Sequence, residues 1–552
     1  MMASRFSSSA GPRKEPVRSR SSRWFSLALL GGALACTYPS SGTGSVSSAG
    51  DPGTKGLHRL NSTEYNATVA DVLGTKLRPA SSLWLGGELD GFDNMASVLN
   101  VDEAQYRRYF DASELIADDV FASADLKDRV VICATEDDAC VQSILANAGL
   151  HLFRRPLGQD EVATYYKVYA TARQLGENHE DSVKQVLRAL LASAEFIYRI
   201  EVDSDLNSTS KHLLSSYELA SRLSYFLWSS APDDALLAAA EDSSLLADDT
   251  LRATVDRMLG DPVKSSRFVE NFAGQWLGAR KLPLHSANPL IFPTWSSALA
   301  NSLTEEIYLY FNEFLQTDRS WLEFMTADFN FVDPSVARLY GLPSIAEATM
   351  QRVEITDDQR FGFAGLGGFL ALSSLGGRTS PTLRGRYVLK NLLCTEPPRP
   401  PPGVPTLSAG GLNPTRNVRT ALEEHRKDPA CASCHARFDP YGLSLEQFDA
   451  IGAYRAAYFD GAPIDPSVEL AGVTFTGLSG LADTVTQDPK FTECISETLF
   501  KYALGRLTTD ADRSYLNTVN QEWLKGTPSI RRLVHSLVLA EPFRFRHGAL
   551  AP

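Results

Sequence analysis

Apolar residues recur at helical spacing along most of this chain, and this periodicity restricts its fold more than any other feature. Residues 141–200 are predicted to be helical throughout, and the pattern continues in segments from residue 213 to residue 315. The strict alternation that is typical of strands is scarce before residue 350. At 552 residues the chain is too long for one core. We therefore predict a mainly α-helical protein made of several modules.

Several predicted helices carry their own start and stop signals. Asn61 precedes an apolar face and is followed three residues later by Glu64, the pattern of a capping box, and Gly74 ends the segment. Ser215 and Glu218 repeat the capping box before a second helix. We expect the aromatic residues of the middle segments to form a core rather than a cofactor site: Phe268, Phe272, Trp276, Tyr308, Phe311 and Phe314.

The first 36 residues have the pattern of an export signal. Basic residues lead into the apolar run 24–35, which is too short to anchor stably in a bilayer. The run ends in Ala33-Leu34-Ala35-Cys36, which resembles the lipobox of bacterial lipoproteins and predicts lipid on Cys36. An ordinary signal peptide cleaved nearby is the alternative. Both predict a cell-envelope protein, facing the periplasm or held as an outer-membrane lipoprotein, with residues 37–56 as a flexible tether.

Charge and hydropathy exclude two classes of partner. The formal net charge is -13, and removal of the basic first 35 residues makes it -18, which argues against nucleic acid. No run of 18 apolar residues is present, so we expect membrane contact through the N-terminal lipid only.

Cys431-Ala432-Ser433-Cys434-His435 is the motif whose spacing points most directly to a chemistry. C-x-x-C-H is the signature of c-type haem attachment, in which the two thiols add across the haem vinyl groups. The histidine that follows binds the iron, so the motif predicts one covalent haem c with His435 as axial ligand.

The same motif is compatible with three different roles. A redox-active disulfide normally begins a helix in a βαβ unit, and no such pattern surrounds these cysteines. A zinc site with His425 as fourth ligand lacks a second C-x-x-C or H-x3-5-H. Chance occurrence is the third. The sequence contains no G-x-S-x-G, no H-E-x-x-H and no second haem motif, so whether the protein is an enzyme is left open.

The second axial position of the iron is not assigned by the motif. No methionine follows it, so a sulfur ligand would have to come from an earlier module, from Met325 or Met350. His425, ten residues before His435, and His535 near the C-terminus are the imidazole candidates. We expect a ligand other than methionine, or an open position, and therefore a lowered reduction potential.

Other polar residues near the motif have less specific assignments. Arg378 and Arg384 are candidates for pairing with haem propionates, although a structural salt bridge accounts for them equally well. Asp439 and Asp449 are expected to cap loops. Farther upstream, Cys133 and Cys140 bracket an acidic loop, and their spacing predicts a local disulfide.

Five sequence blocks together resemble a known family. They are His58-Arg-Leu-Asn with Glu64-Tyr-Asn, Arg378-Thr-Ser-Pro-x-x-Arg-Gly385, the C-x-x-C-H block with Asp439-Pro-x-Gly442, Glu446-x-Phe-Asp-Ala-Ile-Gly452, and Tyr502-Ala-Leu-Gly-Arg506. They are similar to the exported multi-module cytochrome-c-like proteins of planctomycetes and myxobacteria, a family without an established reaction. The resemblance implies an exported haem protein with five modules, the fourth carrying the C-x-x-C-H, at residues 57–130, 131–200, 210–345, 358–460 and 461–545.

The resemblance also gives the remaining cysteines a role. With lipid on Cys36, haem on the motif and a local disulfide, Cys394 and Cys494 are left to pair across about 100 residues. The expected function is electron transfer in the cell envelope, with an unknown redox partner. The alternatives are a haem enzyme, either peroxidase-like or with a substrate pocket in the 210–340 region, and a non-enzymatic scaffold with zinc or a disulfide at the motif.

Overall fold

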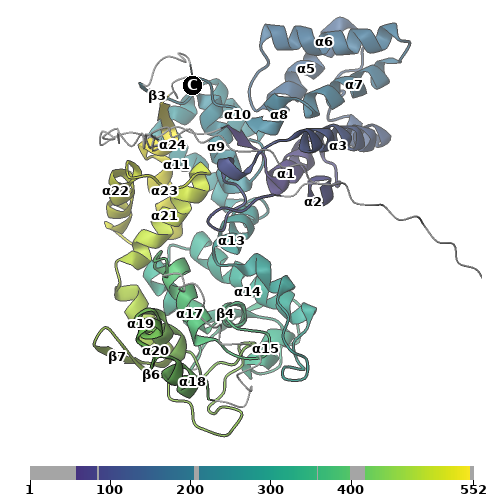
Figure 1. The fold of residues 1–552 in the computed structure, drawn as a ribbon. Helices are drawn as coiled ribbons and strands as arrows, with labels where there is room; N and C mark the ends of the chain where they lie inside the picture. Colours follow the sequence, from purple (N-terminus) through teal and green to yellow (C-terminus); the bar gives the residue numbers. More distant parts are fainter. Residues whose placement is uncertain (1–56, 84–85, 204–209, 357–358, 398–416, 548–552) are drawn as a thin grey trace, which may run out of the picture. The chain divides into compact units, whose positions relative to one another are not determined.

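The computed structural model describes residues 57–83, 86–203, 210–356, 359–397 and 417–547. The export signal, Cys36 and the tether therefore lie outside the described residues. The described part is mainly α-helical, as predicted, and its few strands are short (Figure 1). Within it, no helix is both long and apolar enough to cross a membrane.

The helices of the first part of the chain begin and end where their caps predict. The side chain of Asn61 accepts from the Glu64 amide, Glu64 accepts in return from the Asn61 amide, and Gly74 adopts a left-handed conformation. The helices of this part are α1 (Ser62–Leu73), α2 (Ala80–Leu83), α3 (Glu103–Ala122), α4 (Ala124–Lys127), α5 (Asp138–Phe153), α6 (Gln159–Gln174), α7 (His179–Leu191) and α8 (Ala194–Ile197).

The helical prediction for residues 141–200 is wrong at its end. Helix α7 stops at Leu191, and Ser193 then caps the short α8. Strand β2 (Tyr198–Arg199) follows and pairs antiparallel with β1 (His58–Arg59). The main-chain groups of Tyr198 and Arg199 are thus bonded to a segment about 140 residues earlier, which helical periodicity cannot reveal.

The middle part of the chain is also helical, and Ser215 and Glu218 form the predicted capping box. Its elements are α9 (Ser216–Trp228), α10 (Asp234–Glu241), α11 (Asp248–Gly260), α12 (Ser265–Phe268), the π-helical turn η3 (Val269–Ala273), α13 (Gly274–Trp276), α14 (Ser297–Gln316), η5 (Trp321–Met325) and α15 (Pro334–Tyr340).

The last part continues with shorter helices, followed by a helical C-terminal region. Its elements are α16 (Gly367–Leu372), α17 (Pro381–Tyr387), the π-helical turn η7 (Val388–Leu392), α18 (Val418–His425), α19 (Pro429–Leu443), α20 (Gly477–Gln487), α21 (Lys490–Leu504), α22 (Asp512–Leu524), α23 (Ile530–Val538) and α24 (Glu541–Arg544).

The remaining strands form three two-stranded antiparallel sheets. Two are local hairpins and one joins distant segments: β4 (Phe329–Val332) with β5 (Gln351–Glu354), β6 (Ser467–Leu470) with β7 (Val473–Thr476), and β3 (Lys211–Leu213) with β8 (Phe545–His547).

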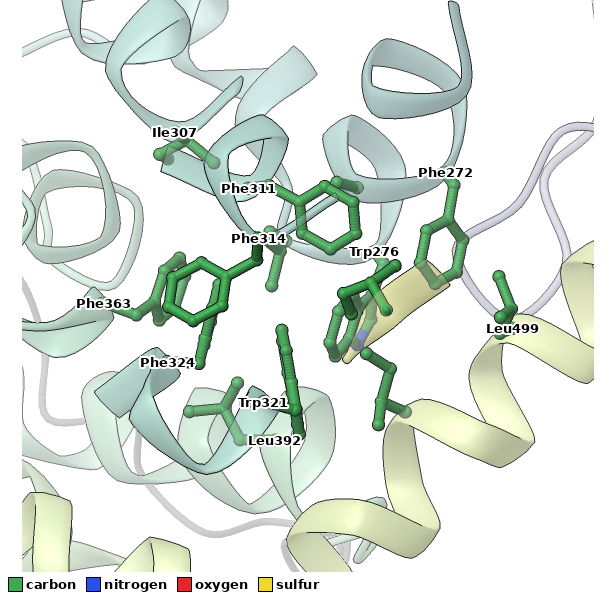
Figure 2. Close-up of a cluster of buried hydrophobic side chains, with 14 of the residues drawn as sticks. Phe272, Trp276, Ile307, Phe311, Phe314, Trp321, Phe324, Phe363, Leu392 and Leu499 are labelled. Carbon is green, nitrogen blue, oxygen red and sulfur yellow. The ribbon is translucent and has the colours of Figure 1, made fainter. Parts of the chain in front are cut away.

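Two main hydrophobic cores hold the described residues together. The smaller core contains side chains from residues 60–197 and one from α9, Tyr225. The larger core draws on residues from Phe92 to Phe543 and is rich in aromatic rings, of which Figure 2 shows one cluster. Trp321 of η5 stacks on Phe324 with ring centroids 4.1 Å apart, and on Phe491 of α21 at 5.4 Å. The prediction that the middle aromatic residues form a core is confirmed.

Two disulfides are present in the described residues. Cys133 is bonded to Cys140, and Cys394, which follows η7, is bonded to Cys494 of α21. The second bond closes a stretch of 100 residues and ties the segment after α17 to the C-terminal helices.

Candidate functional site

Helix α19 carries the C-x-x-C-H motif in its first turns. Cys431 and Cys434 are three residues apart on this helix, so their side chains lie on one side of it. Both are half-buried free thiols, whereas the other four cysteines of the described residues are in disulfides. The side chain of His435 is 14% exposed. Two thiols and an imidazole are therefore available together at the start of one helix.

His435 is oriented by a carboxylate on its own helix. Its Nδ1 atom lies 2.9 Å from Oδ2 of Asp439, whose side chain is fully buried. An imidazole that donates its Nδ1 proton to a carboxylate keeps the lone pair on Nε2, the atom that is then free to bind a metal. Metal-bound histidines are commonly held in this way by an acceptor behind the ring.

Asp439 is in turn held by a second helix. The hydroxyl group of Thr382, on α17, donates to Oδ1 of Asp439 at 2.9 Å. The prediction that Asp439 caps a loop is wrong, because this residue lies inside α19 with both oxygens accepting hydrogen bonds. The H-x-x-x-D spacing, which puts the two side chains on one helix face, was the signal that could have identified it.

Two glycines allow α17 and α19 to approach closely enough for this contact. A Cβ atom on Gly385 of α17 would overlap the carbonyl oxygen of Phe438, and one on Gly442 of α19 would overlap the carbonyl oxygen of Pro381. Only glycine fits where two backbones meet at this distance. The Arg-Thr-Ser-Pro-x-x-Arg-Gly and Asp-Pro-x-Gly blocks are thus the two sides of one helix crossing.

Arg384 has a structural role in place of the expected propionate contact. Its side chain is fully buried, and its guanidinium donates to three carbonyl oxygens after α19, those of Leu445, Phe448 and Asp449, at 2.7–2.9 Å. Burial lowers the pKa of Arg384 to about 10, although the nearby carboxylate of Glu446 opposes this change. These bonds fix the chain that leaves α19, and we leave Arg384 out of the candidate site.

The other predicted arginine, Arg378, is half-buried and donates to the carbonyl oxygen of Thr379 at 3.1 Å. Its pKa is lowered by burial, while Glu446 raises it. The same carboxylate accepts from the Thr379 hydroxyl at 2.9 Å and from Arg455 at 3.0 Å. Arg378 therefore lies beside a buried ionic cluster and stays a candidate for an anionic group.

His425 does not lie opposite His435. The two rings meet edge to face, with centroids 4.9 Å apart and planes at 77°. A haem lies between its two axial ligands, so two imidazoles in direct contact cannot bind opposite faces of it in this arrangement. The expectation that His425 is the opposite-face ligand is therefore corrected.

The other candidate ligands also have partners elsewhere. Nε2 of His535 lies 2.9 Å from a carboxylate oxygen of Asp256 on α11. Met325 is fully buried in the larger core, and Met350 is packed against that core. Among the described residues, no group of three or more His, Cys, Asp or Glu side chains is placed to hold a metal ion.

The donor set at the start of α19 fits a covalent c-type haem. The residues would hold it through the Cys431 and Cys434 thiols and through Nε2 of His435, whose orientation is fixed from behind by Asp439. When bound, the group would supply one-electron redox chemistry.

Two cavities elsewhere in the protein are candidate small-molecule sites. One of about 410 Å³ is lined by side chains from four segments, including Asp90, Trp276, Lys390 and Lys501. The other, of about 500 Å³, lies in the region where a substrate pocket was expected, between η3 and α14. Burial raises the pKa of its Glu270 carboxyl.

The helical modules described above define the class, a multi-module α-helical protein with one C-x-x-C-H helix. Five family models, each described as a protein of unknown function, match it in order: DUF1587 at residues 58–122, DUF1595 at 140–201, DUF1592 at 214–342, DUF1588 at 360–458 and DUF1585 at 471–543. The chain belongs to the multi-module cytochrome-c-like family that its sequence resembles. Comparisons with curated proteins and with solved structures found no match.

Proposed function

We propose that this protein is an exported c-type haem protein of the cell envelope that transfers electrons. The observation that carries the proposal is the start of α19, where two free thiols and an imidazole with Nε2 available stand together. Cys431 and Cys434 attach the group, His435 binds it, and Asp439 holds the proton on Nδ1 of His435. The partner is a second redox protein that meets this site from the aqueous side.

The place of action is part of the same proposal. The basic and apolar N-terminal pattern supports export, and Cys36 is the proposed lipid attachment point. Substitution of Cys36 by serine releases the protein from the membrane fraction or leaves its precursor uncleaved. Unchanged fractionation of this variant contradicts lipid attachment.

The test is production of the full chain in a host that matures c-type cytochromes. Haem staining after denaturing electrophoresis is expected for the wild type and lost in Cys434→Ala, because the covalent bond to the second cysteine is then missing. Ser433→Ala changes an exposed residue between the two cysteines and should keep the stain. A folded, exported wild-type protein without stain contradicts the proposal.

A haem enzyme is the second candidate function, and the contact between His425 and His435 favours it. Because these rings touch, His425 does not supply the opposite axial ligand in this arrangement. An open position would bind carbon monoxide in the reduced protein. Rapid binding supports a ligand-binding or catalytic site, and its absence supports electron transfer alone.

A further inference from the structure

We propose that Asp439 is the positioning residue that makes His435 a strong donor and thereby gives this site a low reduction potential. The inference rests on the proposed haem attachment and deepens it by naming the class of partner. A low-potential site exchanges electrons with donors of comparably low potential, unlike a site of the His/Met type.

The geometry around Asp439 concentrates its charge on His435. Both carboxylate oxygens accept, Oδ2 from His435 at 2.9 Å and Oδ1 from Thr382 at 2.9 Å. The side chain has no exposed surface, so water does not compete for these oxygens. A hydrogen bond to an ionised acceptor is stronger than a neutral one, and burial strengthens it further.

The chemical consequence follows from the direction of this hydrogen bond. A carboxylate behind Nδ1 makes the imidazole more basic at Nε2. A more basic ligand stabilises the ferric state more than the ferrous state, because the ferric ion carries the larger charge. The reduction potential therefore falls.

A purely structural role for Asp439 is the competing hypothesis. Asp439 also links α19 to α17 through Thr382, so its loss could act through the helix crossing alone. That role changes stability but does not change the electron affinity of a group on the other side of His435. The two hypotheses therefore differ in the reduction potential.

The experiment compares midpoint potentials of the haem-loaded full chain in Asp439→Asn and in the wild type. Asparagine keeps the shape and the hydrogen bond but removes the charge. We expect the potential to rise by at least about 59 mV, which is a tenfold change in a one-electron equilibrium. Thr382→Val keeps Asp439 and should give a smaller rise.

Asp449→Asn is the matched control. Asp449 lies in the same module and accepts from the main-chain amides of Ile451 and Ala453. Its substitution should leave the potential unchanged. An unchanged potential in Asp439→Asn, or an equal rise in Asp449→Asn, overturns the proposal.

A second measurement does not need the cofactor. In the protein without haem, ¹⁵N-labelled histidine should show His435 with its proton on Nδ1 and slow exchange of that proton, and Asp439→Asn should speed the exchange. A ring with its proton on Nε2 overturns the role of Asp439. Failure of haem attachment with the expected His435 signal contradicts the proposed function instead.

Discussion

A single carboxyl group, that of Glu306, is fully buried where α14 meets the segments that follow it. Asn330 donates to it at 2.8 Å, the hydroxyl of Tyr340 donates to the same oxygen, and the charge of Arg360 lies nearby. Burial raises the pKa of Glu306 to about 7, against the lowering effect of these partners. This carboxyl group therefore binds a proton more tightly in the folded chain than in the unfolded chain.

We predict that Glu306 makes the protein lose stability as the pH rises. The contribution is fully present below pH 4.5, where both states are protonated, and is lost as the pH rises through about 7. The loss is on the order of 3 kcal/mol. Denaturation at pH 5 and pH 8 should show it in the wild type and not in Glu306→Gln. The exposed neighbour Glu305, changed to Gln, is the control, and equal pH dependence in wild type and Glu306→Gln refutes the prediction.

Residues that act through local rules were predictable from the sequence. The capping boxes at Asn61 and Ser215 depend on partners three residues away, and the C-x-x-C-H motif is contiguous. The roles of Asp439 and Arg384 were not predictable, because their partners come from other segments. Thr382 is 57 residues from Asp439, and the carbonyl oxygens that hold Arg384 begin 61 residues later.

At the scale of elements, the crossing of α17 and α19 depends on its two glycines. We predict that Gly385→Ala destabilises the protein by roughly 1–3 kcal/mol or more, because the new methyl group overlaps the carbonyl oxygen of Phe438 and forces the helices apart. Thermal unfolding measures the loss. Gly260, at the end of α11, has open space at its Cβ position and is the control. A melting temperature for Gly385→Ala equal to that of Gly260→Ala contradicts the prediction.

Helices were more predictable than strands in this chain. An amphipathic helix satisfies its own main-chain hydrogen bonds, so periodicity and caps determine it locally. The two-residue strand β1 finds its partner β2 only after α1 to α8 have packed. The helix crossing was unpredictable for the same reason, since its two glycine motifs appear in the sequence as separate blocks.

At the scale of the whole molecule, the two disulfides should contribute unequally. We predict that replacing Cys394 and Cys494 by alanine costs roughly 4–5 kcal/mol in the chain-entropy model, because this bond closes 100 residues. The Cys133–Cys140 bond spans only 7 residues, so its removal should cost roughly 2–3 kcal/mol. Unfolding under non-reducing conditions compares the two double variants. A larger loss from the shorter loop counts against this ranking.

The distribution of the cores predicts which fragments fold alone. The smaller core is almost complete within residues 57–201, so we expect this fragment to unfold cooperatively, as followed by circular dichroism. Residues 358–460 share the larger core with segments on both sides, so they should show no cooperative transition alone. Cooperative unfolding of the second fragment would refute this division. Sequence blocks mark the modules, but core membership depends on contacts hundreds of residues apart.

The ends of the larger core meet across most of the chain. Asn94 donates to the carbonyl oxygen of Tyr502 at 2.8 Å across 408 residues, and the Ala96 amide donates to Gly505 at 2.8 Å. At a synthesis rate of about 5–20 residues per second, the early segment waits about 20–80 s for these partners. During that time Phe92 and Met95 are exposed to aggregation. Slower, cooler production and holding chaperones should therefore raise the yield of folded protein more than extra copies of the gene.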